Sequence, residues 1–407
     1  MLQKITVFAL KITCLVFFYL LSYMWLGVFI SRTILVGAVN VLLFFGVLLL
    51  NVKFTLNRNF INQLFILLLL FGFFAMTQGL ILGIFMTLSY TPALFLFVLP
   101  ENLKKDILNF VTKWFAIIVG LGLLTYFVIS IIHIRPFLPP VMGKEIERYP
   151  IFFNYIFYLK PNFGSETLVR FQGIFLEPGH LALNCVLLLA ANNFDFKRNK
   201  YLWYLLAGIL ISISLAGYLL FAIGWILLRI KNMKTMIYSA AIAIIAFIGV
   251  QVWGGGNNVV NDNILARLET DKHAGIKGNN RTVPRTDKMY NQALSTGEIW
   301  IGVSKASAED VVGAGYKKFF IMFGIVPAIL IFAYYWNLKQ PRTNRRYALG
   351  FFLLLILIFL DCEYPHWFSW MFSFTLGCGT HLRKSNRISY YKQDSQQEDE
   401  PIPAQIT

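Results

Sequence analysis

The chain has 407 residues, of which 57% are hydrophobic and only 14% are charged. With a mean hydropathy of +0.63, this composition excludes a soluble globular domain. The net charge of +16 does not indicate nucleic-acid binding, because the basic residues lie mainly in short connections between apolar runs.

Apolar runs long enough to cross a membrane recur along the whole chain. A bilayer core of ~30 Å needs about 20 consecutive apolar residues in a helix. We interpret the first run as an uncleaved helix, because no small-x-small cleavage site follows it. The pattern predicts spans near residues 6–30, 34–51, 60–75, 79–99, 113–133, 175–192, 200–213, 215–230, 235–253, 318–336, 346–361 and 366–380.

The basic residues predict how the chain is oriented in the membrane. They gather in alternate connections between spans and in the segment after the last span, which the positive-inside rule places in the cytoplasm together with both termini. If the apolar run 201–230 crossed the membrane only once, every later connection would lie on the opposite side, and its basic residues would be outside. We therefore expect a hairpin that turns near Ser212, Ser214 and Gly217, which gives about twelve spans.

These features predict an all-α polytopic integral membrane protein with about twelve transmembrane helices. Residues 1–380 form a single transmembrane domain, with two long outer loops at 134–174 and 254–317. Residues 381–407 are polar and are expected to be a disordered cytoplasmic tail. No internal repeat is visible, which disfavours transporter folds built from inverted halves.

The first outer loop ends in the sequence RFQGIFLEPGH, residues 170–180. A charge at bilayer depth costs roughly 2.5–3.5 kcal/mol, so such residues usually face a cavity and mark a substrate path. The planar guanidinium of Arg170 suits phosphate oxygens. Glu177 is a candidate general base, or a partner of Arg170.

Each of these residues also has a simpler interpretation. Glu177 and Pro178 fit the N-terminus of a helix, where an acidic side chain and an early proline are both favourable. His180 alone is typical of a packing or interfacial histidine.

The second outer loop contains GNNRTVPRTDKMYNQALSTGEIWIGVS, with Arg281 and Arg285 four residues apart. Apolar residues recur at helical spacing after Arg285, which predicts a short amphipathic helix lying on the mouth of the bundle. A solvated loop surface is the alternative for both arginines. Two separate loops that present arginines to one mouth favour an anionic ligand.

A third outer element, DCEYPHW, connects the last two spans at residues 361–367. Glu363 and His366 are candidates for supporting residues near the same mouth. The alternative is an interfacial turn anchored by Trp367 and Trp370.

The cysteines show no pattern of metal ligands. We interpret all four as small hydrophobic residues within or beside spans. They are Cys14, Cys185, Cys362 and Cys378.

Four features together resemble one family. They are the R-x-x-G-x-x-x-E-P-G run at 170–179, the S-x-x-G hairpin at 214–217, an R…Y-x-x-A-L…G-x-G-like loop at 285–315, and two long outer loops in a frame of about twelve spans. In these the chain is similar to the bacterial O-antigen polymerase and O-antigen ligase superfamily, polytopic GT-C-type glycosyltransferases that act on undecaprenyl-pyrophosphate-linked glycans. The glycine pattern departs from the family's usual G-x-G, so either Arg281 or Arg285 matches the family's arginine.

The resemblance implies a polymerase of the bacterial inner membrane with its active site facing the periplasm. It would transfer a growing glycan from undecaprenyl pyrophosphate to the next lipid-linked repeat unit, in O-antigen, lipopolysaccharide, capsule or exopolysaccharide biosynthesis. Arg170 and either Arg281 or Arg285 would hold the pyrophosphate, with Glu177 as the first and His180 as the second choice for the base. A chain-length regulator protein is a candidate partner.

The residues also favour a metal-independent enzyme without a cofactor. Guanidinium groups can stabilise the charge that develops on a pyrophosphate leaving group. The outer loops contain no D-x-D pair and no His and carboxylate cluster at ligand spacing.

Other functions stay open at this stage. An O-antigen ligase would use the same donor but transfer the glycan to lipid A-core or to a protein. Ligases of the family typically carry a histidine near a G-x-x-G pattern, whereas His273 lies well before the glycines here. A flippase or transporter of the lipid-linked oligosaccharide would need charges deep within the spans. A scaffold subunit without chemistry is a further alternative.

Overall fold

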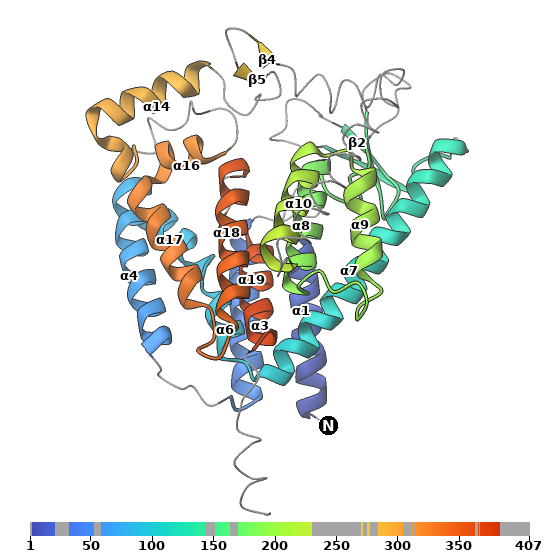
Figure 1. Cartoon of the computed structure of the whole chain (residues 1–407), viewed down its shortest axis with the longest axis horizontal. Helices are drawn as coiled ribbons and strands as arrows, with labels where there is room; N and C mark the ends of the chain where they lie inside the picture. The colour runs from blue at the N-terminus through green and yellow to red at the C-terminus, as the bar shows by residue number, and fades with distance from the viewer. Residues whose placement is uncertain are drawn as a thin grey trace, which may run out of the picture.

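The computed structural model describes residues 2–20, 32–52, 58–132, 134–142, 151–162, 170–229, 270–271, 275–276, 284–303, 311, 315–362, 365 and 367–382. The described chain is mostly helical, and most helices run between two ends of one bundle (Figure 1).

The elements follow one another along the chain in this order. They are α1 (Leu2–Leu20), α3 (Arg32–Leu49), α4 (Arg58–Gln78), α5 (Leu80–Leu88), α6 (Pro92–Val98), α7 (Glu101–Ile131), β1 (Leu138–Met142), β2 (Ile151–Asn154), β3 (Leu159–Pro161), α8 (Pro178–Ala191), α9 (Leu202–Ile211), α10 (Leu215–Arg229), β4 (Thr270–Asp271), β5 (Gly275–Ile276), α14 (Pro284–Thr296), the 3-10 helix η2 (Glu298–Trp300), α16 (Tyr316–Phe323), α17 (Ile325–Asn337), α18 (Arg345–Asp361) and α19 (Phe368–Thr380).

The lengths of the helices are compatible with a helical membrane protein. Among the described residues, α4, the α5–α6 pair and α7 are long and apolar enough to cross a membrane, as are α16 and α17 if they count as one bent span. Several further apolar helices are shorter. A total of twelve spans is therefore not confirmed, and the span predicted at 235–253 lies outside the described residues.

Helix α4 shows why the bundle suits lipid. One face buries Phe60, Leu67 and Phe74 inside the protein. The opposite face leaves Phe65 and Leu68 exposed. A helix that is apolar on all sides but only partly covered by protein needs an apolar solvent for its remaining face.

Helix α19 lies at the centre of the bundle. Its residues Phe368 to Gly379 are all buried, and it packs against α1, α6, α7, α8 and α18. Gly377 allows the closest approach, because a Cβ there would lie 2.5 Å from the hydroxyl of Tyr347 on α18.

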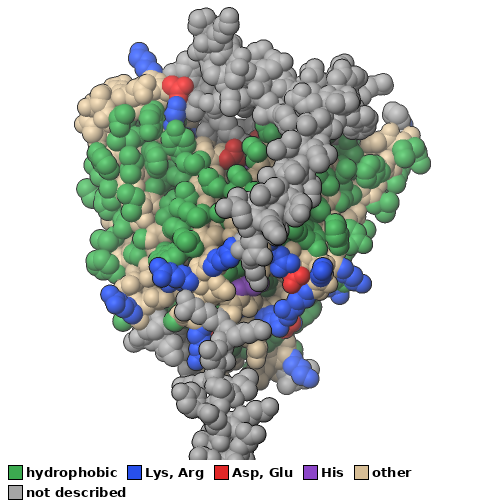
Figure 2. Space-filling view, viewed as in Figure 1, with side chains coloured by type: hydrophobic (Ala, Val, Ile, Leu, Met, Phe, Trp, Pro, Cys, Tyr) green, Lys and Arg blue, Asp and Glu red, His purple; other side chains and the backbone are tan. Residues whose placement is uncertain are grey.

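The two ends of the bundle differ in charge and in content. Helix α1 begins at the lower end in Figure 1, and α14 lies across the upper end. Lys and Arg side chains form a band across the lower part of the surface, below a broad hydrophobic region (Figure 2). We call the lower end the basic end and the upper end the loop end.

Several predictions from the sequence are confirmed. The run 201–230 forms a hairpin, because α9 ends at Ile211 and α10 begins at Leu215, with Ile213 between them at a φ of 47°. The amphipathic helix expected after Arg285 is α14. All four cysteines are buried, and none of them forms a disulfide.

The expectation of an all-α chain is wrong in one respect, since the described residues include two small sheets. Strands β1, β2 and β3 form an antiparallel sheet within the first outer loop, with a register irregularity between Leu138 and Val141. Strands β4 and β5 form a second pair. Strands of two to five residues are too short to show a clear alternation of apolar and polar side chains in the sequence.

The span predicted at 318–336 is also corrected. It consists of α16 and α17, which are bent by 109° at Gly324. Gly324 has a φ of 91°, and a Cβ there would lie 2.5 Å from the carbonyl carbon of Ile301. Gly302 has a φ of 87°, and its own Cβ would lie 2.7 Å from the carbonyl carbon of Phe323. The bend therefore depends on two glycines whose backbones cross in contact.

We expect Gly324→Ala to lower the free energy of unfolding by about 2–5 kcal/mol. A left-handed alanine costs about 1–2 kcal/mol, and overpacking against Ile301 adds about 1–3 kcal/mol. Titration of the purified protein with a denaturing detergent, followed by circular dichroism, measures the change.

Gly72→Ala is the matched control, because a Cβ at Gly72 in α4 has nothing within 4 Å. It should leave the free energy of unfolding unchanged or raise it by up to about 1 kcal/mol. Equal stability of both variants would contradict the role of the glycine crossing.

Candidate active site

The segment 170–177 leads the chain from the first outer loop into the bundle. Phe171 to Leu176 are all buried, and Gly173 turns the backbone with a φ of 57°. The carbonyl oxygen of Gly173 accepts a hydrogen bond of 2.8 Å from the backbone N–H of Leu159 in β3. The sheet of the first loop thus fixes the position at which α8 begins.

Arg170 is held against the turn between α9 and α10. Its Nε donates a hydrogen bond of 3.2 Å to the carbonyl oxygen of Ser212. The charge of Arg170 also acts on the phenol of Tyr218, whose hydroxyl donates to the carbonyl oxygen of Leu210 at 2.6 Å. Arg170 and Ser212, 42 residues apart in sequence, are therefore in contact just before the S-x-x-G run at 214–217.

Glu177 and His180 lie one helical turn apart at the start of α8. Glu177 Oε2 is 3.8 Å from His180 Nε2, and their side chains are 48% and 16% exposed. The imidazole of His180 packs edge-on against Trp367, with 5.1 Å between ring centres. The pair thus combines a solvent-accessible carboxylate with a histidine that is fixed by packing.

The helix-start interpretation of Glu177 is confirmed only for the backbone. Glu177 occupies the N-cap position of α8 and Pro178 the first turn, but no cap hydrogen bond from the Glu177 side chain is formed within the described structure. The carboxylate lies beside the His180 side chain, within the first turn of α8, and makes no cap hydrogen bond to the backbone of that turn.

Close packing joins the start of α8 to the α9–α10 turn. A Cβ at Gly217 would lie 2.5 Å from Ala182 Cβ, and one at Gly179 would lie 3.9 Å from Ser214 Oγ. We call the group formed by Arg170, Glu177, His180 and residues 212–214 the α8 entrance. It brings three predicted site residues into one region at the loop end of the bundle.

Arg285 lies elsewhere at the loop end. It is exposed on α14, which packs on α16 through an ion pair of 2.6 Å between Lys317 Nζ and Asp287 Oδ1. Lys317 Nζ also lies 5.5 Å from the ring centre of Tyr290. In Figure 1, α14 and the group α8–α10 are on opposite sides of the loop end, so the described structure does not bring Arg285 to the α8 entrance.

The remaining predicted residues, Arg281, Glu363 and His366, lie outside the described residues. Trp367, which follows His366, reaches the α8 entrance through its contact with His180. Both Trp367 and Trp370 are buried, so these two indoles are not the lipid-facing anchors that the alternative interpretation of this turn requires. The contact of Trp367 with His180 was missed, because the residues are far apart in sequence.

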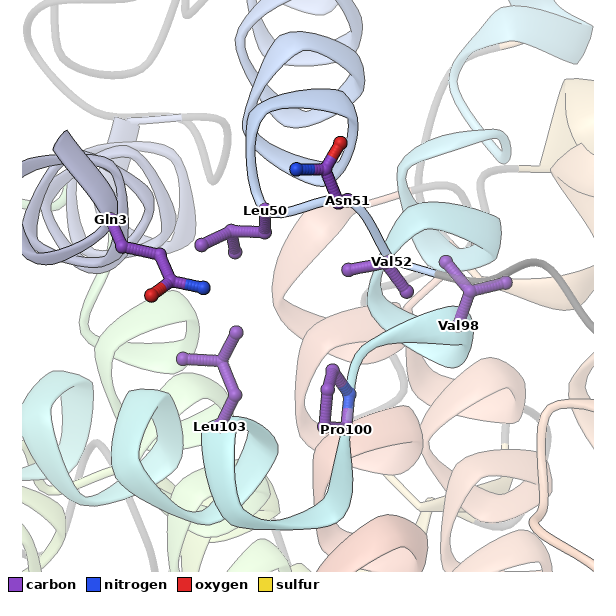
Figure 3. Close-up of a pocket in the computed structure, with 7 residues that line it drawn as sticks. All are labelled: Gln3, Leu50, Asn51, Val52, Val98, Pro100 and Leu103. Carbon is purple, nitrogen blue, oxygen red and sulfur yellow. The ribbon is translucent and has the colours of Figure 1, made fainter.

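Two cavities lie outside the α8 entrance. One of about 450 Å³ at the basic end is lined by Gln3, Leu50, Asn51, Val52, Val98, Pro100 and Leu103 (Figure 3). In Figure 3 the amide of Gln3 points toward Leu50 and Leu103. The other, of about 600 Å³, is lined by Gln78, Gly79, Leu80, Ile81, Leu82 and Phe85 at the break between α4 and α5. Among the described residues, no group of three or more His, Cys, Asp or Glu is placed to hold a metal ion.

No family model, no curated protein and no solved structure matches this chain.

Removal of the Lys317–Asp287 ion pair should loosen α14 while the α8 entrance stays intact. The two side chains are 25% and 41% exposed, and an exposed pair is worth about 0.2–1 kcal/mol. We expect Asp287→Asn to raise amide hydrogen exchange in α14 by up to about fivefold. Hydrogen-exchange mass spectrometry of the purified protein measures this.

The control for this experiment is Lys288→Gln, which alters an exposed neighbour on the same helix. It should leave exchange in α14 unchanged. Faster exchange in α8 as well as α14 after Asp287→Asn would show that the two regions are not separate.

Proposed function

We propose that this protein polymerises lipid-linked oligosaccharide repeat units. It would transfer a growing glycan from undecaprenyl pyrophosphate to the next lipid-linked unit, without a metal, at the periplasmic face of the bacterial inner membrane. In this proposal the loop end of the bundle faces the periplasm and the basic end faces the cytoplasm.

The observation that carries the proposal is the α8 entrance. An arginine held by the α9–α10 turn lies there in the same region as a carboxylate and a histidine at the start of α8, at the end of an otherwise apolar bundle. Helix packing alone does not require charged groups at such a position, and charged groups in a membrane bundle usually mark a functional site. The resemblance noted from the sequence rests on the same residues.

Arg170 would bind the pyrophosphate of the donor. Its hydrogen bond to the Ser212 carbonyl orients the guanidinium plane before any substrate arrives. A preorganised cation stabilises the charge that develops on the leaving group without the cost of reorganisation. Because Arg285 lies on the other side of the loop end, we assign the pyrophosphate to Arg170 first and keep Arg281 or Arg285 as a predicted second contact.

Glu177 would act as the general base. A hydroxyl of the acceptor sugar attacks the anomeric carbon of the donor glycan, and its proton passes to the Glu177 carboxylate. The bond between the anomeric carbon and the pyrophosphate oxygen breaks, and undecaprenyl pyrophosphate leaves. His180, 3.8 Å from Glu177, is placed to hold the carboxylate in position or to take the proton in its place.

The position of one buried cation gives no support to a transporter. The buried cation Lys104 lies near the start of α7, where its Nζ donates a hydrogen bond of 2.5 Å to the carbonyl oxygen of Phe97. It is therefore near the basic end and not midway along the helix. A ligase remains the nearest alternative, since it shares the donor chemistry.

The deciding experiment incubates the purified protein with an undecaprenyl-pyrophosphate repeat unit from the native host, in the presence of EDTA. A ladder of products of increasing length supports a metal-independent polymerase. Transfer only to added lipid A-core would make the protein a ligase. Folded protein that gives neither product would overturn the enzyme proposal in favour of a transporter.

We expect Arg170→Gln to lower the rate of polymerisation by about 10²–10³, the usual effect of removing one group that stabilises a developing anion. Product length and initial rate on the gel measure the effect. Arg135→Gln, which removes an exposed arginine near β1 at the same end, is the matched control and should polymerise normally. Normal activity of a well-expressed Arg170→Gln variant would contradict the proposal that Arg170 binds the pyrophosphate.

Glu177→Gln should slow transfer by about 10²–10⁴ while donor binding changes little, because a general base acts in the transition state. Single-turnover rates and donor binding are measured separately on the same preparation. Equal losses in rate and binding would instead indicate that Glu177 only shapes the start of α8.

A further inference from the structure

His381 lies at the basic end of the bundle, where both its ring and its backbone make specific contacts. It follows the last turn of α19, and its imidazole stacks on Tyr347 of α18 with 4.3 Å between ring centres and an angle of 20°. Its backbone carbonyl accepts a hydrogen bond of 2.9 Å from the N–H of Asn344. Contacts on both ring and backbone therefore fix the position of this histidine.

The hydrogen bonds of the ring identify its neutral tautomer. His381 Nδ1 lies 3.0 Å from the carbonyl oxygen of Gly377 and 3.1 Å from Thr380 Oγ1. A carbonyl oxygen only accepts hydrogen bonds, so Nδ1 carries the proton in the neutral ring. Nε2 then carries a lone pair and can donate a hydrogen bond only after His381 gains a second proton.

The surroundings of His381 are net positive. The charges of Arg198, Asp195 and Arg229 all act on the imidazole. Asp195 Oδ1 accepts from the backbone N–H of Arg198 at 3.4 Å and lies 3.8 Å from Arg229 Nη2. Asp195 thus contacts the guanidinium of Arg229 and only the backbone of Arg198. Two arginine charges and one carboxylate charge act on the histidine, which leaves a net positive charge beside it.

Aromatic and basic side chains at this end mark the level of lipid headgroups. Lys339 Nζ lies 4.8 Å from the ring centre of Trp336, and Lys113 Nζ lies 5.8 Å from the rings of both Trp114 and Tyr201. Such pairs of aromatic rings and cations are typical of the membrane–water interface.

We propose that Arg198, Arg229 and His381 bind the phosphate of an anionic lipid headgroup at the basic end, and that His381 takes up a proton when the phosphate binds. Guanidinium forks match phosphate oxygens. Basic pockets between membrane helices at the cytoplasmic side are known to hold phosphate headgroups. The proposal does not depend on the polymerase activity, because this site and the α8 entrance lie at opposite ends of the bundle.

The environment of His381 favours its neutral form before the lipid binds. Burial lowers the pKa of His381, and the charges of Arg198 and Arg229 lower it further, whereas the Gly377 hydrogen bond and Asp195 oppose this change. A bound phosphate adds negative charge beside Nε2 and raises the pKa again. Lipid affinity should therefore increase as the pH falls, because the bound state holds one more proton than the free state.

The test uses the purified full-length chain in neutral detergent, titrated with phosphatidylglycerol. Native mass spectrometry counts bound lipids, and the thermal unfolding midpoint reports their effect. We expect Arg198→Gln combined with Arg229→Gln to weaken binding at least about tenfold, as expected for charge-assisted hydrogen bonds. Lys200→Gln combined with Arg342→Gln removes the same charge from exposed positions at the same end and is the matched control.

Each outcome of this titration decides the proposal. Binding by the site variant as tight as that of the wild type, or equal loss in the control variant, would overturn it. Inorganic phosphate could also stabilise the protein when phosphatidylglycerol does not, with the same dependence on Arg198 and Arg229. That result would contradict the proposal that the phosphate belongs to a lipid headgroup. If the double variant does not fold, Arg198→Gln alone serves, because this side chain is exposed.

The proton uptake has its own readout. Wild-type affinity for phosphatidylglycerol should rise about tenfold from about pH 8 to about pH 5.5, because the bound state holds a proton that the free state lacks. His381→Phe keeps an aromatic ring against Tyr347 and should bind with an affinity that does not change with pH. Wild-type binding that is independent of pH would overturn the role of His381.

Discussion

The burial of α19 on every side is the constraint on which the rest of the structure depends. Small residues let its neighbours approach closely: the Tyr347 hydroxyl reaches past Gly377 to donate to the Ala190 carbonyl of α8 at 2.9 Å. Thr343 Oγ1 donates to the Cys378 carbonyl at 2.9 Å and ties the start of α18 to the end of α19. These hydrogen bonds satisfy polar groups in a place that water does not reach, which an apolar interior demands.

The helices of the bundle differ in how much of their surface protein covers. Residues Leu181 to Ala191 of α8 are all buried, whereas α4 packs one apolar face inward and leaves Phe65 and Leu68 exposed on another. The hydrophobic effect drives the whole bundle into the membrane but does not distinguish one helix neighbour from another once there. Specific polar contacts supply that distinction, such as the 2.6 Å hydrogen bond from Gln63 Nε2 on α4 to the Asn337 carbonyl at the end of α17.

The same central helix adjoins both groups of charged residues. At the loop end, Trp367 precedes α19 and packs against His180. At the basic end, His381 follows α19 and stacks on Tyr347. The two histidines differ in their partners: His180 lies beside a carboxylate, whereas His381 lies where two arginines face one aspartate. The first environment suits proton transfer, and the second suits the binding of an anion.

The sequence by itself determined the features that depend on near neighbours. The helices follow from long apolar runs, the hairpin at 212–214 from the charge of the later connections, and the proximity of Glu177 to His180 from their spacing of three residues. Only the tertiary structure decided that Arg170 meets Ser212, that Trp367 meets His180, that α16 and α17 bend at Gly324, and that α14 lies away from the α8 entrance. Each of these depends on contacts between segments distant in sequence. Their geometry is set by backbone crossings and by the packing of whole helices. Such contacts do not alter the local periodicity of apolar residues, so they cannot be predicted from it.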